Sequence, residues 1–459
     1  MEDKSTFVRN HILGMLESGE LNAGEKLPGA RELLPGSGIS LPTIQNAIEI
    51  LVREGVLETI PRKGTFVQTQ WKKRILQQNL MVFRSGLTWF SDLRELIHRE
   101  IPEVWVSERF SGGTFEIQTT HYIQAHHDRY LDLSGIFASC FPDQSDFFQT
   151  PIDAFRIGSR LIGVPIIFSP RVIFYNPKLF LQAGCRKPEA GWTWDDLLEC
   201  VRKLRRILPP EDVFCWHNQT QNWINMVRRA GGCLIDPNCT DSVKIDSPET
   251  RRGLRLYREL RNEIGISQYR YPDDFVSHFL SGRAAMLLEP REFRSLITKA
   301  AFEDWDTAPL PRIEGGLDVN VQATDVFCVR RDCVEPELAA RLLKLLLSPE
   351  FQNCLARWNY GIPIRKSAVG ATIDCTDPRD VLFLSETPKM CSHYHLDSAE
   401  IYNLVCQGIA NLLAGDEDID AGTAELAEMV RTCLKIRKQA ALFARKQKES
   451  NLIYAGEVS

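Results

Sequence analysis

The sequence predicts a multidomain chain in which a small α+β domain precedes a larger, two-lobed α/β part. With 459 residues, the chain is long enough for two or three domains of about 100–200 residues each. Residues 24–67 combine a short helix signal, a Gly/Ser turn, an amphipathic helix and a basic hairpin. From Leu80 onward, strand-like and helical segments alternate, which indicates an α/β architecture with mainly parallel sheets. The roughly 380 residues after this point exceed one hydrophobic core, so two lobes are expected.

The amphipathic helix that starts near residue 40 is the most informative element of the small domain. Ser40 is a suitable N-cap, and Pro42 falls in the first turn, where a missing N–H is tolerated. Apolar residues recur at spacings of three and four and therefore face a core: Ile44, Ala47, Ile48 and Leu51. The opposite face is polar and holds Thr43, Gln45, Asn46 and Glu49. A helix that presents such side chains after a shorter helix is the arrangement that enters a DNA major groove.

The hairpin that follows carries positive charge at its tip. Arg62, Lys63 and Gly64 form this tip, and residues 61–79 contain no acidic side chain. Glycine lets the turn approach a nucleic-acid backbone closely, and the cations can replace the counterions of phosphates. The alternative is a solvated turn. Upstream of these elements, a first helix is expected over residues 7–17, where apolar residues recur every four positions.

In this order the elements resemble the winged helix-turn-helix of the GntR family of bacterial repressors. The matching segments are LPGAREL (27–33), ISLPTIQNAI (39–48), Leu51 with EG at 54–55, and KGTFV (63–67). The resemblance implies a DNA-binding set that consists of Arg31, Ser40, Thr43, Gln45, Asn46, Arg62, Lys63 and Gly64. Leu41 and Gln45 stand where the family usually has arginine, so two of its charge-assisted contacts are missing. A helical domain of about 70 residues that contacts protein is the alternative.

The composition is that of an ordinary soluble globular protein, with 44% hydrophobic residues, 25% charged residues and a net charge of −5. The N-terminus, MEDKSTFVRN, has no signal-peptide pattern, and no apolar run approaches the about 18 residues of a membrane span. Thirteen scattered cysteines without a CxxC pair favour reduced thiols. We therefore expect a cytoplasmic protein that does not enter a membrane.

The expected domains are residues 1–70, a polar linker at 71–79, and residues 80–459. Strands are expected at 80–83, 164–168, 172–175, 284–288 and 326–329. Helices are expected at 89–99, 194–206, 248–263, 335–347, 398–414 and 421–447. The helix at 194 has a capping signal, because Thr193 precedes it and Asp196 stands at its third position.

Residues 80–459 resemble, over nearly their whole length, the bacterial extracellular solute-binding proteins that feed sugar ABC importers. The resemblance rests on segments in a shared order: GVPIIFSPRVIFYNPKLFLQAG (163–184), GWTWDDLLE (191–199), RAGG (229–232), FLSGRAAMLLE (279–289), WDTAPLP (305–311), YGIP (360–363) and IANLLAGDEDIDAG (409–422). It implies a periplasmic-binding-protein-like fold, in which two α/β lobes joined by hinge strands close on a ligand. The hinge crossing is expected near Tyr175 and Asn176.

By this resemblance, the ligand is a small solute, and a sugar in particular. Sugar rings stack on aromatic side chains, while polar groups fix their orientation. The candidate ligand-binding residues are Arg171, Tyr175, Trp216, Trp223, Glu289, Arg291, Asn320, Trp358 and Tyr360. Glu289 and Arg291 follow the SGRAAM segment, where a cleft-facing loop is expected. For each aromatic residue, packing in a core is the alternative.

The two resemblances together predict a ligand-responsive bacterial transcription regulator rather than an enzyme. An importer's binding protein needs an export signal, and this N-terminus shows none. The expected partners are double-stranded operator DNA and a small-molecule effector, a carbohydrate by resemblance. A homodimer is expected, because one short recognition helix reads few bases and two-fold operators mirror two-fold proteins.

Other classes of protein were weighed against this prediction. Some GntR-type heads are fused to a PLP-dependent aminotransferase-like domain with a Schiff-base lysine, but this chain has no Ser-Lys dipeptide. A non-enzymatic importer protein and a regulator with a LacI-like sugar domain are further alternatives. His121, His126 and His127 have no cysteine or carboxylate at metal-ligand spacing, so no metal site is predicted, and no cofactor is predicted either.

Overall fold

A computed structural model describes most of the chain. It covers residues 4–35, 38–77, 79–82, 87–107, 113–215, 220–236, 239–265, 275–392 and 398–456, with most side chains up to residue 440. Contacts divide the chain into two units. Unit 1 consists of residues 1–119, 129–168 and 324–373, and unit 2 consists of residues 120–128, 169–323 and 374–459.

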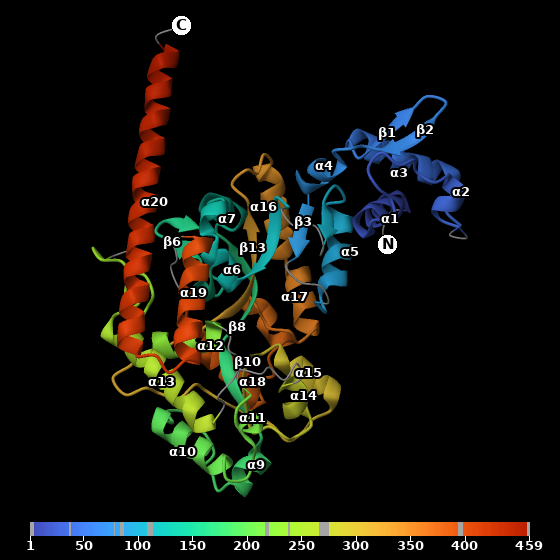
Figure 1. Cartoon of the computed structure of the whole chain (residues 1–459). Coiled ribbons are helices and arrows are strands. Elements are labelled where there is room, and N and C mark those ends of the chain that lie inside the picture. The colour runs from blue at the N-terminus through green and yellow to red at the C-terminus, as the bar shows by residue number, and fades with distance from the viewer. Residues whose placement is uncertain are drawn as a thin grey trace. The chain divides into compact units, whose positions relative to one another are not determined.

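The head, which we define as residues 4–77 of unit 1, has three helices, a hairpin and a fourth helix (Figure 1). Its elements are α1 (Lys4–Ser18), α2 (Ala30–Leu33), α3 (Leu41–Arg53), β1 (Leu57–Ile60), β2 (Gly64–Val67) and α4 (Trp71–Gln77). Ser40 caps α3 and Pro42 lies in its first turn, as predicted. The strands β1 and β2 pair antiparallel with Ile60 opposite Gly64. The predicted winged helix-turn-helix is therefore present.

The segment predicted as a polar linker is instead a helix that contributes to the core of the head. Trp71 and Ile75 of α4 are each 4% exposed, and they pack in one hydrophobic cluster with residues of α1, α3 and β2. Trp105, on strand β4 (Trp105–Ser107), belongs to the same cluster. The linker prediction is wrong because the segment was judged by its many polar and charged residues. Trp71 and Ile75 are spaced four residues apart, which puts both on one face of a helix.

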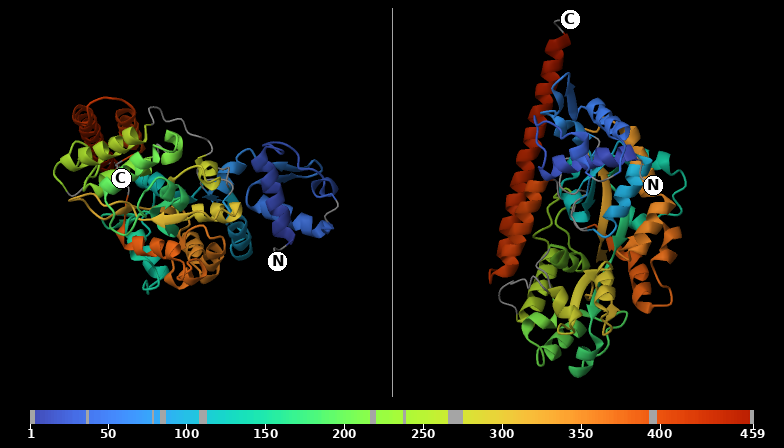
Figure 2. Two further views of the ribbon diagram at one scale, coloured as in Figure 1. Left: turned by 90° about the horizontal axis from the view of Figure 1, so that it is seen from below. Right: turned by 90° about the vertical axis from the view of Figure 1, so that its right-hand side faces the viewer.

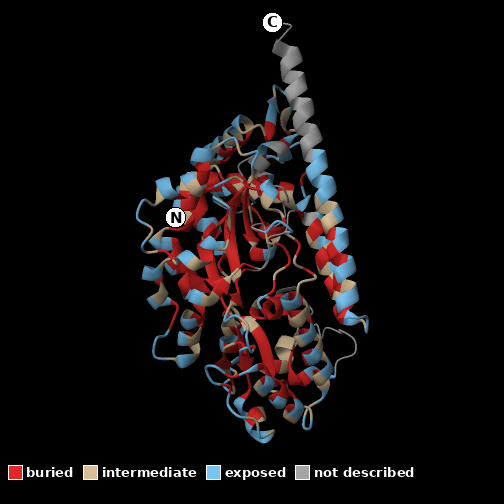
Figure 3. Ribbon diagram, turned by 90° about the vertical axis from the view of Figure 1, so that its left-hand side faces the viewer, coloured by how far each residue is buried: buried red, intermediate tan, exposed pale blue. Residues whose placement is uncertain are grey.

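The rest of unit 1 is built on a six-stranded sheet of order β14–β8–β13–β5–β3–β4. Besides β4, its strands are β3 (Asn79–Val82), β5 (Phe115–Thr119), β8 (Val164–Ser169), β13 (Ala323–Val329) and β14 (Ile362–Pro363). Its further elements are α5 (Phe90–Glu100), α7 (Ser134–Cys140), α8 (Gln149–Asp153), the hairpin β6 (Arg156–Ile157) and β7 (Arg160–Leu161), α16 (Pro336–Leu346) and α17 (Pro349–Arg357). The strands are buried almost throughout, whereas the helices expose one face (Figure 3).

Unit 2 has a three-stranded sheet of order β10–β9–β11 and a short parallel pair, β12 with β15. These strands are β9 (Arg171–Tyr175), β10 (Met286–Pro290), β11 (Asp306–Ala308), β12 (Asn320–Val321) and β15 (Met390–Cys391). The helices are α6 (Thr120–Ala125), α9 (Pro177–Gln182), α10 (Trp194–Leu204), α11 (Pro210–Val213), α12 (Thr220–Arg229), α13 (Pro248–Ile264), α14 (Phe275–Leu280), α15 (Phe293–Ala300), α18 (Pro378–Glu386), α19 (Ala399–Ala414) and α20 (Ile419–Gly456). The predicted capping box of α10 forms, with Thr193 and Asp196 bonded reciprocally at 2.8 and 3.2 Å.

The direction of the strands differs from the prediction of mainly parallel sheets. β3 runs parallel to β4 and β5, but β13 is antiparallel to β5, and β14 is antiparallel to β8. In unit 2, β9 is antiparallel to both β10 and β11. Alternation of helix and strand predicts parallel pairing only where successive strands are neighbours in one sheet. Here partners such as β5 and β13 come from distant parts of the chain.

The C-terminal end of the chain forms a helical pair. α19 lies alongside the first part of α20 (Figure 2), where Leu426 and Val430 of α20 join the same apolar cluster as Ile409 of α19. Arg431 of α20 pairs with Asp241 and Asp246 at 3.0 and 2.9 Å. Of the helices in the described ranges, none is both long and apolar enough to cross a membrane.

The chain passes between the two units at places other than the predicted hinge. The unit boundaries follow residues 119, 128, 168, 323 and 373. Tyr175 and Asn176 lie inside unit 2, where the Tyr175 hydroxyl donates to Asp306 at 3.0 Å and Asn176 caps α9. The crossing nearest to the predicted hinge therefore follows Phe168, near the end of β8 and before Pro170, which separates β8 from β9.

Candidate DNA-binding and ligand-binding sites

The exposed face of α3 presents one unengaged amide. Thr43 is occupied by the cap, since its hydroxyl lies 2.7 Å from Ser40 Oγ. Asn46 is exposed, but its Nδ2 donates to Ser5 Oγ of α1 at 3.1 Å. Gln45 is exposed, and within the part of the chain that the structure describes its side chain has no hydrogen bond. Leu41, at the start of the helix, is 54% exposed.

The tip of the hairpin gathers three basic residues. Arg62 and Lys63 are exposed, and Arg62 adopts a left-handed backbone with φ of 64°. Gly64 has φ of 118°, and a Cβ there would lie 2.6 Å from Cε of Lys26. Lys26 therefore lies beside the tip, although it was not predicted from the sequence, where it precedes the LPGAREL motif. Arg31 lies in α2, and its side chain is outside what the structure describes.

A charged cluster in unit 2 contains two of the predicted ligand-binding residues. Arg171 opens β9 opposite Pro290 of β10, so that Glu289 is one register position away. Burial raises the pKa of Glu289 to about 7, against the opposing charge of Arg171. Burial, followed by the charge of Arg171, lowers the pKa of His121 on α6 to about 4. From the sequence, His121 was considered only as a metal ligand.

The backbone of Arg171 is held by Asn320. The Arg171 N–H donates to Asn320 Oδ1 at 3.0 Å, and Asn320 Nδ2 donates back to the Arg171 carbonyl at 2.7 Å. Asn320 itself is fully buried. The Nε of Arg171 is also buried and has no hydrogen-bond partner among the described residues. Such an orphaned donor is rare in folded proteins and marks a place where a ligand or water can bind.

Arg291 has a structural partner instead of a free guanidinium. Its side chain is fully buried, and its Nε and Nη2 bond Asp380 of α18 at 3.1 and 3.0 Å. Its backbone N–H donates to Ser169 Oγ at 2.9 Å. A buried arginine requires such a bidentate pair with a carboxylate, because an unpaired charge in the interior lowers the stability of the fold strongly. Arg291 therefore holds α18 to β10, and we leave it out of the proposed ligand-binding set.

The predicted aromatic residues fall into two groups. Trp223 and Tyr175 are each 1% exposed and belong to the apolar core of unit 2, as the core-packing alternative expects. Trp358 in unit 1 is 37% exposed, and its indole N–H donates to Asp92 at 2.6 Å. Tyr360 packs edge-on against Trp89 at 6.4 Å between ring centroids. Trp216 lies outside the described residues.

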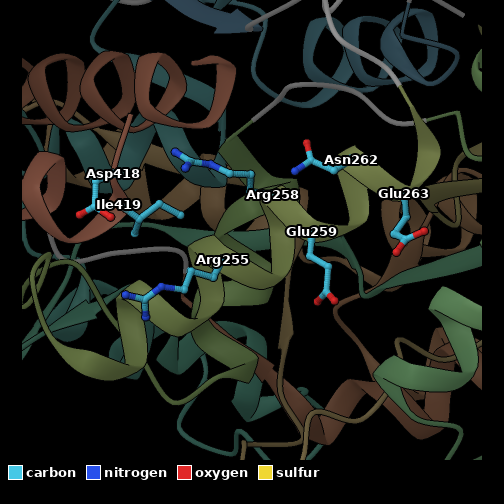
Figure 4. A pocket seen from close by; sticks show the side chains of 7 residues that line it. All are labelled: Arg255, Arg258, Glu259, Asn262, Glu263, Asp418 and Ile419. Atoms are coloured by element: carbon cyan, nitrogen blue, oxygen red, sulfur yellow. The ribbon is translucent and has the colours of Figure 1, made fainter. Parts of the chain in front are cut away.

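A pocket of about 640 Å³ lies on α13 beside the start of α20 (Figure 4). Its lining is Arg255, Arg258, Glu259, Asn262, Glu263, Asp418 and Ile419. Most of its charged side chains already have partners: the Trp194 indole donates to Glu259 at 3.2 Å, Arg202 pairs with Glu263 at 2.6 Å, and Arg255 pairs with Asp420. None of the predicted ligand-binding residues lines it, so this surface pocket does not serve the predicted role.

In the described ranges, no three His, Cys, Asp or Glu side chains are arranged to hold a metal ion.

The fold and these sites define a protein that joins a DNA-binding head to a solute-binding body. Residues 127–378 match the family described as bacterial extracellular solute-binding protein, and the chain belongs to this family. Residues 4–67 match the family described as bacterial regulatory proteins, gntR family. Both resemblances inferred from the sequence are thereby confirmed, and all of the quoted motifs except IANLLAGDEDIDAG (409–422) lie within the matched residues.

Relatives of two kinds match parts of the chain. A probable fructoselysine utilization operon transcriptional repressor of Escherichia coli O157:H7 is 26% identical over 212 residues, covering 44% of this chain and 82% of the repressor. An uncharacterized lipoprotein in the oleD 5' region of Streptomyces antibioticus is 24% identical over 252 residues. That match covers 52% of this chain and only about half, 54%, of the lipoprotein.

Solved structures with this fold include sugar-binding proteins. The GacH receptor of Streptomyces glaucescens, solved unliganded and with acarbose, superposes with a TM-score of 0.62 at 16% identity. It covers 78% of this chain and 98% of its own. An ABC transporter solute-binding protein from Thermotoga lettingae with bound α-D-tagatose has a TM-score of 0.63 at 15% identity, with 77% and 98% covered. At these identities the likeness shows the fold alone.

Proposed function

We propose that the chain is a ligand-responsive bacterial transcription regulator. The observation that carries the proposal is that one chain joins a head that matches the gntR family over residues 4–67 to a body that matches a solute-binding family over residues 127–378. The head would bind double-stranded operator DNA, and the body would bind a small-molecule effector. A cytoplasmic location, a homodimer, the absence of enzymatic activity, and a body that spans residues 80–459 are parts of the same proposal.

On the DNA side, α3 would read bases and the hairpin tip would contact phosphates. The free amide of Gln45 can make a bidentate contact to adenine, and the exposed Leu41 can pack on a thymine methyl group. Lys26, Arg62 and Lys63 would neutralise phosphates without reading sequence. Asn46 could reach a base only by giving up its bond to Ser5, so we rank it below Gln45.

On the ligand side, the charged cluster of unit 2 is the proposed anchor. Arg171 offers an unsatisfied buried donor, and Glu289 and His121 lie within its electrostatic reach. Donors and acceptors side by side suit hydroxyl groups, and proteins of this fold have been solved with sugars bound. Trp358 and Tyr360 of unit 1 remain candidates for stacking on a sugar ring.

We expect Gln45→Ala to change base preference, and Arg62→Ala to weaken binding to all sequences alike. The first substitution removes a groove contact that is worth roughly 1–3 kcal/mol, and the second removes one phosphate contact and lowers the salt slope by about one. The measurement is selection of duplexes from a random pool by the full chain, followed by binding across a range of salt concentrations. Asn22→Ala, at an exposed head residue bonded to Glu25, is the matched control. If Gln45→Ala and the parent select the same sequences, the proposal that Gln45 of α3 reads bases in the major groove is contradicted.

A further inference from the structure

The head is joined to the rest of unit 1, which we call the first lobe (residues 79–119, 129–168 and 324–373), by a polar contact as well as by the shared hydrophobic cluster around Trp105. Arg9 of α1 is 2% exposed, and its Nε lies 3.0 Å from both carboxylate oxygens of Glu54. Glu54 is the C-cap residue of α3. The same guanidinium donates from Nη2 to the Glu103 carbonyl, just before β4, at 3.3 Å. One buried arginine thus touches the end of the recognition helix and the first lobe together.

The neighbouring residue of α1 makes a second contact, this time to α5. Asn10 Nδ2 donates to Nδ1 of His98 at 2.8 Å. His98 stacks on Trp105 with ring centroids 6.1 Å apart and planes inclined by 20°. Burial, followed by the charges of Arg94 and Arg9, lowers the pKa of His98 to about 4, so the ring is neutral at pH 7 and can accept this bond.

The opposite end of α5 touches a residue that we proposed for the ligand. Asp92, in the first turn, accepts the indole N–H of Trp358 at 2.6 Å and the thiol of Cys354 at 2.9 Å. Trp89, which precedes α5, packs against Tyr360. With 11 residues the helix is roughly 16 Å long. Its buried face, which includes Leu93 and Ile97, fixes it in the first lobe.

We propose that α5 is a relay, and that Arg9, Asn10 and His98 are positioning residues that couple the first lobe to α3. A shift of Asp92 that follows ligand contact at Trp358 would move His98 and therefore α1. Arg9 would carry that movement to the end of α3 through Glu54. A flexible linker could not transmit this movement. The contacts of Arg9 and Asn10 are at least partly buried, and they join α1 to α3 on one side and to the first lobe on the other. The inference rests on the proposed function, since it assigns a route between its two sites.

The route can be tested from the DNA end, since coupling between two sites is reciprocal. The probe is a duplex selected by the full chain from a random pool, and the readout is hydrogen exchange of the full chain with and without it. The duplex should slow exchange in α3 through direct contact. It should also slow exchange in α5 by about fivefold or more, although α5 carries none of the proposed DNA contacts.

Asn10→Ala should keep the protection of α3 and lose most of the protection of α5. His98→Gln is a second variant for the case in which Asn10→Ala fails to fold; its side chain can still accept a hydrogen bond, so it should keep part of the protection of α5 and lose the rest. Arg99→Gln is the matched control on α5, because Arg99 is exposed and pairs with Glu100 and Glu350 instead of the head. It should leave both protections unchanged.

The outcomes separate the relay from the proposed function. If no duplex is enriched, or α3 is not protected, the proposed function fails and the relay fails with it. If α3 is protected but exchange in α5 is unchanged in the parent chain, the relay is overturned while the DNA-binding role stands. Equal protection of α5 in the parent and in both joint variants would also overturn it.

Discussion

Asp380→Ala is expected to destabilise unit 2 by about 3–5 kcal/mol, because it leaves the charge of Arg291 buried without its partner. Arg291 is fully buried and Asp380 is 1% exposed. Asp380 also accepts the backbone N–H of Asp374 at 3.0 Å and pairs with Arg294. Urea unfolding followed by near-ultraviolet circular dichroism would measure the loss as a shift of the midpoint at constant slope.

Asp332→Ala is the matched control for this substitution. Asp332 receives the same fork from Arg330, with both contacts at 3.0 Å, but its side chain is 68% exposed. Exposed pairs contribute about 0–1 kcal/mol, so this variant should unfold close to the parent. Equal losses in the two variants would show that burial does not decide the cost. A small loss for Asp380→Ala would return Arg291 to the candidates for ligand binding.

Gly253→Ala is expected to cost about 3 kcal/mol, at the upper end of overpacking effects. Gly253 lies in α13 where it crosses α12, and a Cβ there would lie 2.4 Å from Cα of Val227 and 2.8 Å from the Met226 carbonyl. Backbone atoms of a helix cannot yield as the end of a flexible side chain can. The helices must therefore separate, and thermal unfolding of the full chain would report the lost packing as a lower Tm.

Gly14→Ala is the matched helical control, because no atom lies within 4 Å of the Cβ position at Gly14 in α1. Alanine exceeds glycine in helix propensity, so this variant should gain roughly 0.5–1 kcal/mol. If Gly253→Ala unfolds at the same temperature as the parent, α12 and α13 do not pack as closely as described.

The sequence predicted the elements whose signals are local. The periodic apolar residues of α1 and α3, the cap at Ser40 and the capping box at Thr193 all appear as expected, because each depends on neighbours within one turn or two. Strand direction was predicted wrongly, since the partner of a strand can lie far along the chain. The role of α4 was missed for a related reason: its partner Trp105 is 34 residues away from Trp71.

The candidate sites are less predictable from the sequence than the fold, because the partners of their polar side chains lie far along the chain. Among the described residues the Gln45 side chain has no hydrogen-bond partner, whereas Asn46 is bonded to Ser5, and nothing in the local sequence distinguishes the two. Arginine and asparagine side chains can hydrogen-bond a ligand, but they can equally well hydrogen-bond other groups of the protein. Arg291 is paired with a residue 89 positions away, and Asn320 holds a backbone 149 positions away. Residue type and spacing alone cannot separate these two uses of a polar side chain.

The central claim is that binding of a solute by the body changes binding of DNA by the head. The direct measurement is a titration of labelled operator duplex with the full chain, at fixed salt, with and without a saturating sugar that raises its Tm. Linked sites typically differ by 1–3 kcal/mol, so a change in operator Kd of about fivefold or more is expected. A sugar that raises the Tm but leaves the operator Kd unchanged would contradict the claim.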